Sequence, residues 1–337
     1  MIDLSEMVGD GLAMLFAPLA YPFDPSRRIF IGFVVVSLIL AFWFFYSKSG
    51  SRNIIAFFKY IFNKKIWLHK SSILDFKILF ANSVFIKIFI IPLIVTKLVI
   101  IVSVSSTLRE TLGVVESIEL SYWVLMLLFT VVIFISEDIT RFFLHVFYHR
   151  IPWLWEFHKV HHSAEVLTLL TLYRTHPVEI VISRTASVLV LGSVTGIFVF
   201  LFPGKLSSIE ILGVDALGFL FNAVGANLRH SHIPLSFGKA NRWVISPVMH
   251  QVHHSKRGIH HDKNFGSCFS IWDRVYGSYY VPRKSERVNF GCNEGGTHTL
   301  VEQWVGPFRR LVKNKMVSHK IVFGRGSSII LRNRTNG

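Results

Sequence analysis

The sequence predicts an all-α integral membrane protein, with about four to five spanning or re-entrant helices and a helical cap outside the membrane. Two features of the composition favour a membrane. Apolar residues make up 51% of the 337 residues, and charged residues only 17%, below the quarter that is usual in soluble proteins. A third observation predicts the cap: 13 of the 16 histidines lie between His145 and His261, where much of the sequence is polar.

The formal net charge of +16 would suggest a nucleic-acid partner in a soluble protein. In a membrane protein, basic residues instead gather in loops that face the cytoplasm and its anionic lipids, so we expect no nucleic acid. Two cysteines, Cys268 and Cys292, are too few for a disulfide framework or a thiolate metal site. The first residues lack a basic segment, so no signal peptide is expected.

Residues 1–120 are expected to form an N-terminal membrane region. Residues 29–46 carry no charge and are long enough to cross a hydrocarbon core of about 30 Å. The basic residues that follow place the next loop in the cytoplasm and the N-terminus outside: Lys48, Arg52, Lys59, Lys64, Lys65, Lys70 and Lys77. A second span is expected over residues 78–104, although Lys87 and Lys97 interrupt it.

Residues 121–282 are expected to form the domain that holds the histidines. A span from Tyr122 to His149 would carry the first histidine pair out of the membrane on the cytoplasmic side. The apolar segments 178–202 and 206–224 fit either two spans or a re-entrant hairpin, and both return the chain to the cytoplasm before His230. Residues 283–337 read as a basic cytosolic C-terminal tail, poorly ordered over 325–337.

Three histidine clusters indicate a metal site. The clusters are His145-x₃-His149, His158-x₂-His161-His162 and His250-x₂-His253-His254. On a helix, residues at i, i+3 and i+4 lie on one face. Eight imidazoles are too many for one ion, so two metal ions are expected. One such pair alone is often incidental, but a five-residue pattern that occurs twice beside apolar spans is hard to explain as solvated surface.

These clusters and their flanks resemble the fatty acid hydroxylase/sterol desaturase superfamily, the membrane di-iron oxygenases with histidine boxes. The segment from Leu154 to Ser163 resembles the second box with its aromatic lead-in, and Arg174-Thr175-His176-Pro177-Val178-Glu179 resembles the element that follows it. Residues 250–255 resemble the third box, while residues 264–266 and 272–277 resemble the segment that closes the domain. The resemblance covers roughly residues 120–282.

The resemblance implies a catalytic domain over residues 121–282 that uses two iron ions, with zinc possible in purified protein, and O₂ as co-substrate. It implies hydroxylation or desaturation of a lipid C–H bond in lipid biosynthesis, with the histidine boxes on the cytoplasmic face. The implied catalytic and metal-binding residues are His145, His149, His158, His161, His162, His250, His253 and His254. His230 is a further candidate ligand, or else a hydrogen-bonded interfacial histidine, whereas His176, His260 and His261 fit supporting roles.

Several neighbouring residues are candidates for supporting the centre. Metal-bound imidazoles usually donate their second N–H to a carboxylate or carbonyl. Asp138, Glu179 and Asp262 are therefore candidates, although Asp138 could equally pair with Arg141. The aromatic residues of the second box are expected in an interfacial belt: Trp153, Trp155 and Phe157.

The chain contains no cysteine cluster, dinucleotide-binding glycine motif or fused haem module, so electrons are expected from a separate ferredoxin or cytochrome partner. Two other classes remain open. A metal transporter would place its ligands near the bilayer midplane. A zinc-dependent membrane hydrolase would need a general-base glutamate, as in H-E-x-x-H, and neither H-x₂-H-H box has one. The sequence does not identify the lipid.

Overall fold

The computed structural model describes residues 11–116, 118–206, 216–223, 226–283, 286, 288–292 and 298–323. Within these ranges the fold is helical, and the only β pairing described is two isolated bridges, Val244 with Phe269 and Ser255 with Phe290. The predicted all-α fold is therefore confirmed for this part of the chain. The α-helices are α2 (Ile31–Ser49), α3 (Ile54–Ile61), α4 (Lys64–Trp67), α5 (Lys70–Leu112), α6 (Tyr122–Arg150), α7 (Pro152–His162), α8 (Pro177–Leu201), α10 (Ala216–Ala223), α11 (Pro247–His253), α12 (Ile271–Tyr276) and α13 (Leu300–Phe323). The 3₁₀ helices are η1 (Ala17–Phe23), η2 (Leu169–Tyr173), η3 (Ala226–His230), η4 (Gly238–Arg242) and η5 (Gly258–His260).

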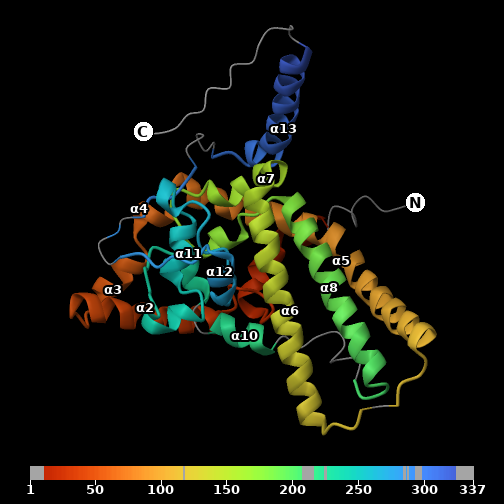
Figure 1. Cartoon of the computed structure of the whole chain (residues 1–337). Coiled ribbons are helices and arrows are strands. Elements are labelled where there is room, and N and C mark those ends of the chain that lie inside the picture. Colours follow the sequence, from red (N-terminus) through yellow and green to blue (C-terminus); the bar gives the residue numbers. More distant parts are fainter. Residues whose placement is uncertain are drawn as a thin grey trace.

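Helices α5, α6 and α8 pack together and extend to one side of the molecule, as Figure 1 shows. Helices α7, α11 and α12 lie at the other end, and α13 projects beyond them. Leu125 and Phe129 of α6 form a buried cluster with Phe198 of α8. Other large apolar side chains of these helices face outward, including Trp123, which is 79% exposed. An apolar outer surface is what a lipid-facing helix requires.

Within the described residues, three helices are long and apolar enough to cross a membrane: α2, α6 and α8. They correspond to the spans expected at 29–46, 122–149 and 178–202. The expected second span lies inside α5, one continuous helix of 43 residues. Of the expected segment 206–224, only Leu206 and α10 are described. The protein is thus a helical membrane protein, and the total of four or five crossings stays a prediction.

Proline residues at helix starts determine how the chain turns around the site. Pro152, Pro177 and Pro247 each occupy the first turn of their helix, where the missing N–H of proline costs nothing. Pro152 also ends α6 immediately after the first histidine pair, because the residue before a proline avoids helical geometry. Helix α7 therefore turns away at Ile151 but packs against α6, which places the second box beside the first.

Two features of the fold were not predicted. The basic segment expected as a loop over residues 48–77 is mostly helical, because it forms α3, α4 and the start of α5. The expected tail contains α13, which contacts α7 and α5. Arg310 of α13 pairs with the buried carboxylate of Glu156 on α7. The poorly ordered end expected at 325–337 lies outside the described residues.

Candidate metal centre

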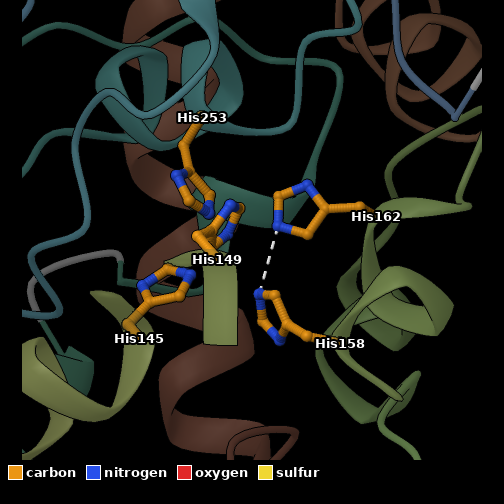
Figure 2. Close-up of side chains that lie close together, drawn as sticks. All are labelled: His145, His149, His158, His162 and His253. Carbon is orange, nitrogen blue, oxygen red and sulfur yellow. Dashed lines mark hydrogen bonds between the residues drawn. The ribbon is translucent and has the colours of Figure 1, made fainter. Parts of the chain in front are cut away.

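The nine candidate ligands form two compact groups. Group one contains His145, His149, His158, His162 and His253, and group two contains His161, His230, His250 and His254. Within each group, one ring nitrogen of every histidine lies within 4.8 Å of the others. Figure 2 shows the five rings of group one converging, with His145 and His149 from α6, His158 and His162 from α7, and His253 above them.

Each H-x₂-H-H box contributes two histidines to one group and one histidine to the other group. From the second box, His158 and His162 enter group one, while His161 enters group two. From the third box, His250 and His254 enter group two, while His253 enters group one. Each group thus contains the i and i+4 histidines of one box and the i+3 histidine of the other. Every group therefore depends on both boxes.

The nitrogen positions fit metal coordination. In group two, the Nε2 atom of His230 lies 3.2 Å from that of His161 and 3.1 Å from those of His250 and His254. A four-coordinate ion at about 2.0–2.1 Å from each nitrogen would hold them about 3.3–3.4 Å apart. In group one, the Nε2 atoms of His145, His149 and His253 are buried without a hydrogen-bond partner. Buried polar atoms left without a partner require a reason, and a metal ion supplies one.

Hydrogen bonds at the far side of the rings support this tautomer. Neutral imidazole binds a metal through one nitrogen and carries its proton on the other. The Nδ1 atom of His158 lies 2.9 Å from a carboxylate oxygen of Glu179. The Nδ1 atoms of three other rings face the carbonyl oxygens of Phe265, Arg174 and Lys263, and these rings are His145, His161 and His253. Because a carbonyl can only accept, these rings donate from Nδ1 and leave Nε2 for a metal.

Burial keeps the imidazoles neutral. Burial lowers the pKa of His158 to about 3 and, with the nearby His158, that of His161 to about 4. It also holds the pKa of His162, His253 and His254 well below the usual value. Neutral imidazole is the form that binds a metal, so the site does not have to lose protons first.

The groups are open on two sides. A cavity of about 420 Å³ reaches both groups, since its lining includes His145 and His158 of group one and His230 of group two. A second hollow of about 300 Å³ reaches both groups through other rings, including His149 and His254. Trp155 lines this second hollow, with its ring 5.0 Å from that of His149 and 5.5 Å from that of His162.

The sequence comparisons agree with this geometry. The family model described as fatty acid hydroxylase matches residues 130–278, a range that contains all nine histidines. Residues 130–278 match the fatty acid hydroxylase family, so this part of the chain is similar to that superfamily. The predicted resemblance is thereby confirmed.

Curated relatives of the fatty acid hydroxylase domain act on lipids, as their names state. Alkylglycerol monooxygenase of Danio rerio is 28% identical over 158 residues, which is 47% of this chain and 31% of the relative. The human alkylglycerol monooxygenase is 24% identical over 47% of this chain and 32% of its own length. Ornithine lipid hydroxylase OlsE of Rhizobium tropici is 25% identical over 50% of this chain and 46% of its own length. The matched region therefore spans less than half of each relative, and no solved structure matches significantly.

The supporting residues of the fatty acid hydroxylase domain differ in part from expectation. Glu179 contacts His158 as expected, but Asp138 accepts hydrogen bonds from Trp272 Nε1 and from the backbone of Cys268 and Phe269. Its expected role in orienting a histidine is therefore wrong, and so is the alternative pair with Arg141, whose partner is Glu137. Asp138 instead holds the segment before α12 against α6.

Other residues near the boxes also occupy different environments. Asp262 pairs with Arg150 at 3.1 Å rather than with a histidine. Of the expected aromatic belt, Trp153 is exposed, but Phe157 is buried against His176 and Phe308. His176 lies outside both groups and caps α8 by accepting the N–H of Val178. His260 pairs with Glu286, so both histidines have the supporting roles expected for them.

Sequence reasoning did not single out the side chain of Arg174. It is fully buried and pairs at 2.9 Å with Asp75 of α5, which is also fully buried. The same guanidinium donates to the carbonyl oxygen of Val160 and to Ser163 at the end of α7. Since the carbonyl of Arg174 accepts from His161, this residue supports the second box from two sides. In the sequence, Arg174 is an arginine two residues before His176, and nothing in this pattern reveals the network.

Proposed function

We propose that the protein is an O₂-dependent monooxygenase that hydroxylates a C–H bond of a membrane lipid. The observation that carries the proposal is the pair of histidine groups, nine buried or half-buried imidazoles, each with one ring nitrogen that faces the others of its group. An alkyl C–H bond does not react with the acids and bases that side chains supply, so a metal must provide the oxidising power. The relatives named as a monooxygenase and a lipid hydroxylase favour hydroxylation over desaturation.

The donor set fits two iron ions. His145, His149, His158, His162 and His253 would hold one ion, and His161, His230, His250 and His254 the other. Bound iron would supply the activation of O₂ that C–H oxidation needs. Zinc would also accept imidazole nitrogen, so purified protein can carry it in place of iron. The protein's own contribution is to keep the imidazoles neutral, with the proton of His158 held at Nδ1 by Glu179.

The two openings suggest separate routes for the reactants. The larger cavity contains apolar side chains of α5, α6 and α8, among them Leu79, Leu144 and Ile180, and suits a lipid chain entering from the bilayer. The second hollow contains Lys256 and Asp262 beside the histidines, and would be the side from which an electron donor approaches. Such a donor, of ferredoxin or cytochrome type, must deliver two electrons per turnover, because O₂ yields one hydroxyl group and one water.

We place the histidine groups on the cytoplasmic side of a multi-pass protein. They lie at the end of α6, beyond its most apolar part, and the basic segment from Lys48 to Lys77 is expected on the same side. This position also argues against a transporter, whose ligands would lie within the spanning region.

Metal content tests the proposal directly. Protein purified from iron-supplemented cells should contain about two iron ions per chain, and a di-iron signal should change on exposure to O₂. His253→Ala should lose iron, because His253 belongs to group one. His232→Ala is the matched control, since this ring lies outside both groups and bonds the carbonyl of Tyr60.

Two outcomes would overturn the proposal. A single zinc ion that resists replacement by iron would favour the zinc-dependent hydrolase. Metal that is retained equally in His253→Ala and His232→Ala would show that the histidine groups are not the metal site, and would favour a transporter or an adventitious site. If the iron content agrees with the proposal, lipid extracts of cells with and without the protein should differ in a hydroxylated lipid.

A further inference from the structure

The cavity that reaches the histidines is unusually rich in arginine. Five arginines line it, together with two glutamates, counted over the residues that the structure describes. The arginines come from four separate parts of the chain: Arg27 and Arg28 precede α2, Arg141 is in α6, Arg184 is in α8 and Arg229 is in η3. They converge only because the fold brings these elements together.

Several carboxylates lie near these arginines, and Asp138 is one of them, since it lines the adjoining hollow and attracts Arg229. The carboxylate of Glu179 faces His158, and that of Glu137 pairs with Arg141 at 2.8 Å and accepts from Ser187. Arg27 pairs with Asp24, at the outer side of the cavity. Among the described residues, no carboxylate forms an ion pair with Arg184, although Glu137 attracts it and Arg141 and Arg27 repel it electrostatically.

A neighbouring hollow of about 300 Å³ adjoins this region, and Glu137 and Asp138 are in its lining. Its lining shares four arginines with the inner cavity, so these side chains lie where the two spaces meet: Arg27, Arg28, Arg141 and Arg184. The remaining lining of the inner cavity mixes polar with apolar side chains, and the apolar ones include Leu79 and Ile86 from α5, Leu144 from α6 and Ile180 from α8. We call these four arginines the arginine collar. The collar adjoins apolar side chains in a cavity that also reaches the metal ligands.

This combination matches the chemistry of one class of molecule. Guanidinium groups bind phosphate through paired, charge-assisted hydrogen bonds, and several together suit a phosphate that carries one or two negative charges. The apolar part of the cavity suits an alkyl chain, which would gain about 0.8 kcal/mol per buried methylene. An anion would also relieve the repulsion among the arginines, which otherwise costs free energy.

We infer that the substrate is an anionic lipid with a phosphate-type head group, held by Arg27, Arg28, Arg141 and Arg184 and oxidised close to that head group. The inference rests on the proposed function and specifies its substrate class. Arginines and histidines line one cavity of about 420 Å³, so a lipid whose head group contacts the arginines presents its nearest carbons to the metal ligands. A carbon near the far end of a long chain would not reach them.

Binding can be measured without catalysis, using the full chain in a neutral detergent without added reductant. The probes are hexadecyl phosphate, hexadecanol, hexadecylphosphocholine and inorganic phosphate, titrated by calorimetry. Hexadecyl phosphate should bind about tenfold or more tightly than each of the other three, because charge-assisted hydrogen bonds and chain burial both contribute. Equal affinity for hexadecanol would overturn the inference, and equal affinity for inorganic phosphate would show that the site takes a free anion.

Variants test whether the arginines cause the preference. Arg184→Gln should reduce the affinity for hexadecyl phosphate about tenfold, while Arg184→Lys, which keeps the charge, should lose less. Arg52→Gln is the matched control, because Arg52 is exposed beside Tyr46 and does not line the cavity. Unfolding temperature and metal content of each variant report whether it folds. If Arg184→Gln folds and keeps the preference, the inference fails.

The two proposals fail separately. If hexadecyl phosphate is not preferred but the protein holds two iron ions that respond to O₂, the monooxygenase stands and only the substrate class is wrong. If the preference is present but iron is absent, the binding site stands and the monooxygenase fails. Tight binding of hexadecyl phosphate by Arg184→Gln and Arg52→Gln alike would assign the effect to the general attraction of basic surfaces for anionic lipids, which would also overturn the inference.

Discussion

At the scale of single residues, four of the nine imidazoles have a second contact that fixes the position of the ring proton. Backbone carbonyls fix three of the rings, and a carboxylate fixes the fourth, since Glu179 faces His158. A carbonyl cannot be removed by substitution, whereas the carboxylate can. Glu179 is therefore the position at which the support of a single ligand can be tested.

We expect Glu179→Ala to weaken metal binding about 10- to 100-fold, the usual effect of removing a partner of a metal-bound histidine. Glu179→Gln should lose less, because its amide oxygen still accepts from His158. Competition with a chelator measures the affinity. Glu119→Gln serves as control, since Glu119 is exposed and pairs only loosely with Lys205. Unchanged affinity in Glu179→Ala would show that the contact does not support the metal.

Arg174 is the residue on which the position of the second box most depends. Its pair with Asp75 is fully buried, and removal of one partner leaves the other charge without compensation. We expect Arg174→Leu to lower the free energy of unfolding by about 3–5 kcal/mol. Arg309→Ala, which breaks an exposed pair with Glu302, should cost at most about 1 kcal/mol. Denaturant unfolding in detergent measures both, and equal losses would contradict the assignment.

At the scale of elements, α5 and α8 approach each other closely where two glycines of α8 lie. Gly192 and Gly196 of α8 face α5, where a Cβ atom on Gly196 would lie 2.8 Å from Val104 and 2.9 Å from the carbonyl oxygen of Ile101. Small residues four apart let two membrane helices approach closely. This spacing is visible in the sequence, but its partner helix is not.

We expect Gly196→Val to destabilise the protein by about 1–3 kcal/mol, since the larger side chain must push α8 away from α5. The shift should also reduce lipid binding, because both helices line the cavity. Gly258→Ala is the control, since a Cβ atom there meets nothing within 4 Å. Thermal unfolding in detergent measures the effect, and a melting temperature equal to that of Gly258→Ala would contradict this packing.

At the scale of the whole molecule, the buried histidines make the metal-free fold sensitive to acid. Unfolded histidine titrates near 6.5, whereas burial lowers the pKa of His158 to about 3 and of His161 to about 4 in the folded chain. Between these values the unfolded chain binds more protons, so the stability contributed by neutral burial is full above pH 6.5 and declines as the pH falls.

We therefore expect the melting temperature of metal-free protein to drop as the pH is lowered from 7.5 to about 4.5. Chelator-treated protein in detergent is suitable for this measurement. His69→Gln should show the same slope, because His69 lies near the surface and outside both histidine groups. A melting temperature that stays constant over this range would mean that the histidines are not buried as neutral rings.

The sequence by itself determined the helical class, three long apolar helices and the histidines that make up the two groups. These follow from local rules, because hydrophobic runs set spans and the i, i+3, i+4 spacing sets which rings share a helix face. It also made Glu179 a candidate partner of a histidine, because metal-bound imidazoles usually donate to a carboxylate and Glu179 lies near the boxes in the sequence. It did not predict α13, whose sequence mixes basic and apolar residues and whose contacts with α7 and α5 are made across the fold.

Only the tertiary structure decided how the nine histidines divide. The H-x₂-H-H spacing puts three rings on one side of a helix, but the i+3 ring points a little away from the i, i+4 pair. The group that the i+3 ring joins depends on the helix that lies opposite. His161 of α7 therefore joins the group of His250 and His254, and His253 of α11 joins the group of His158 and His162. The arginine collar has the same origin: Arg27, Arg141 and Arg184 are far apart in the chain, and only packing turns them into one charged surface.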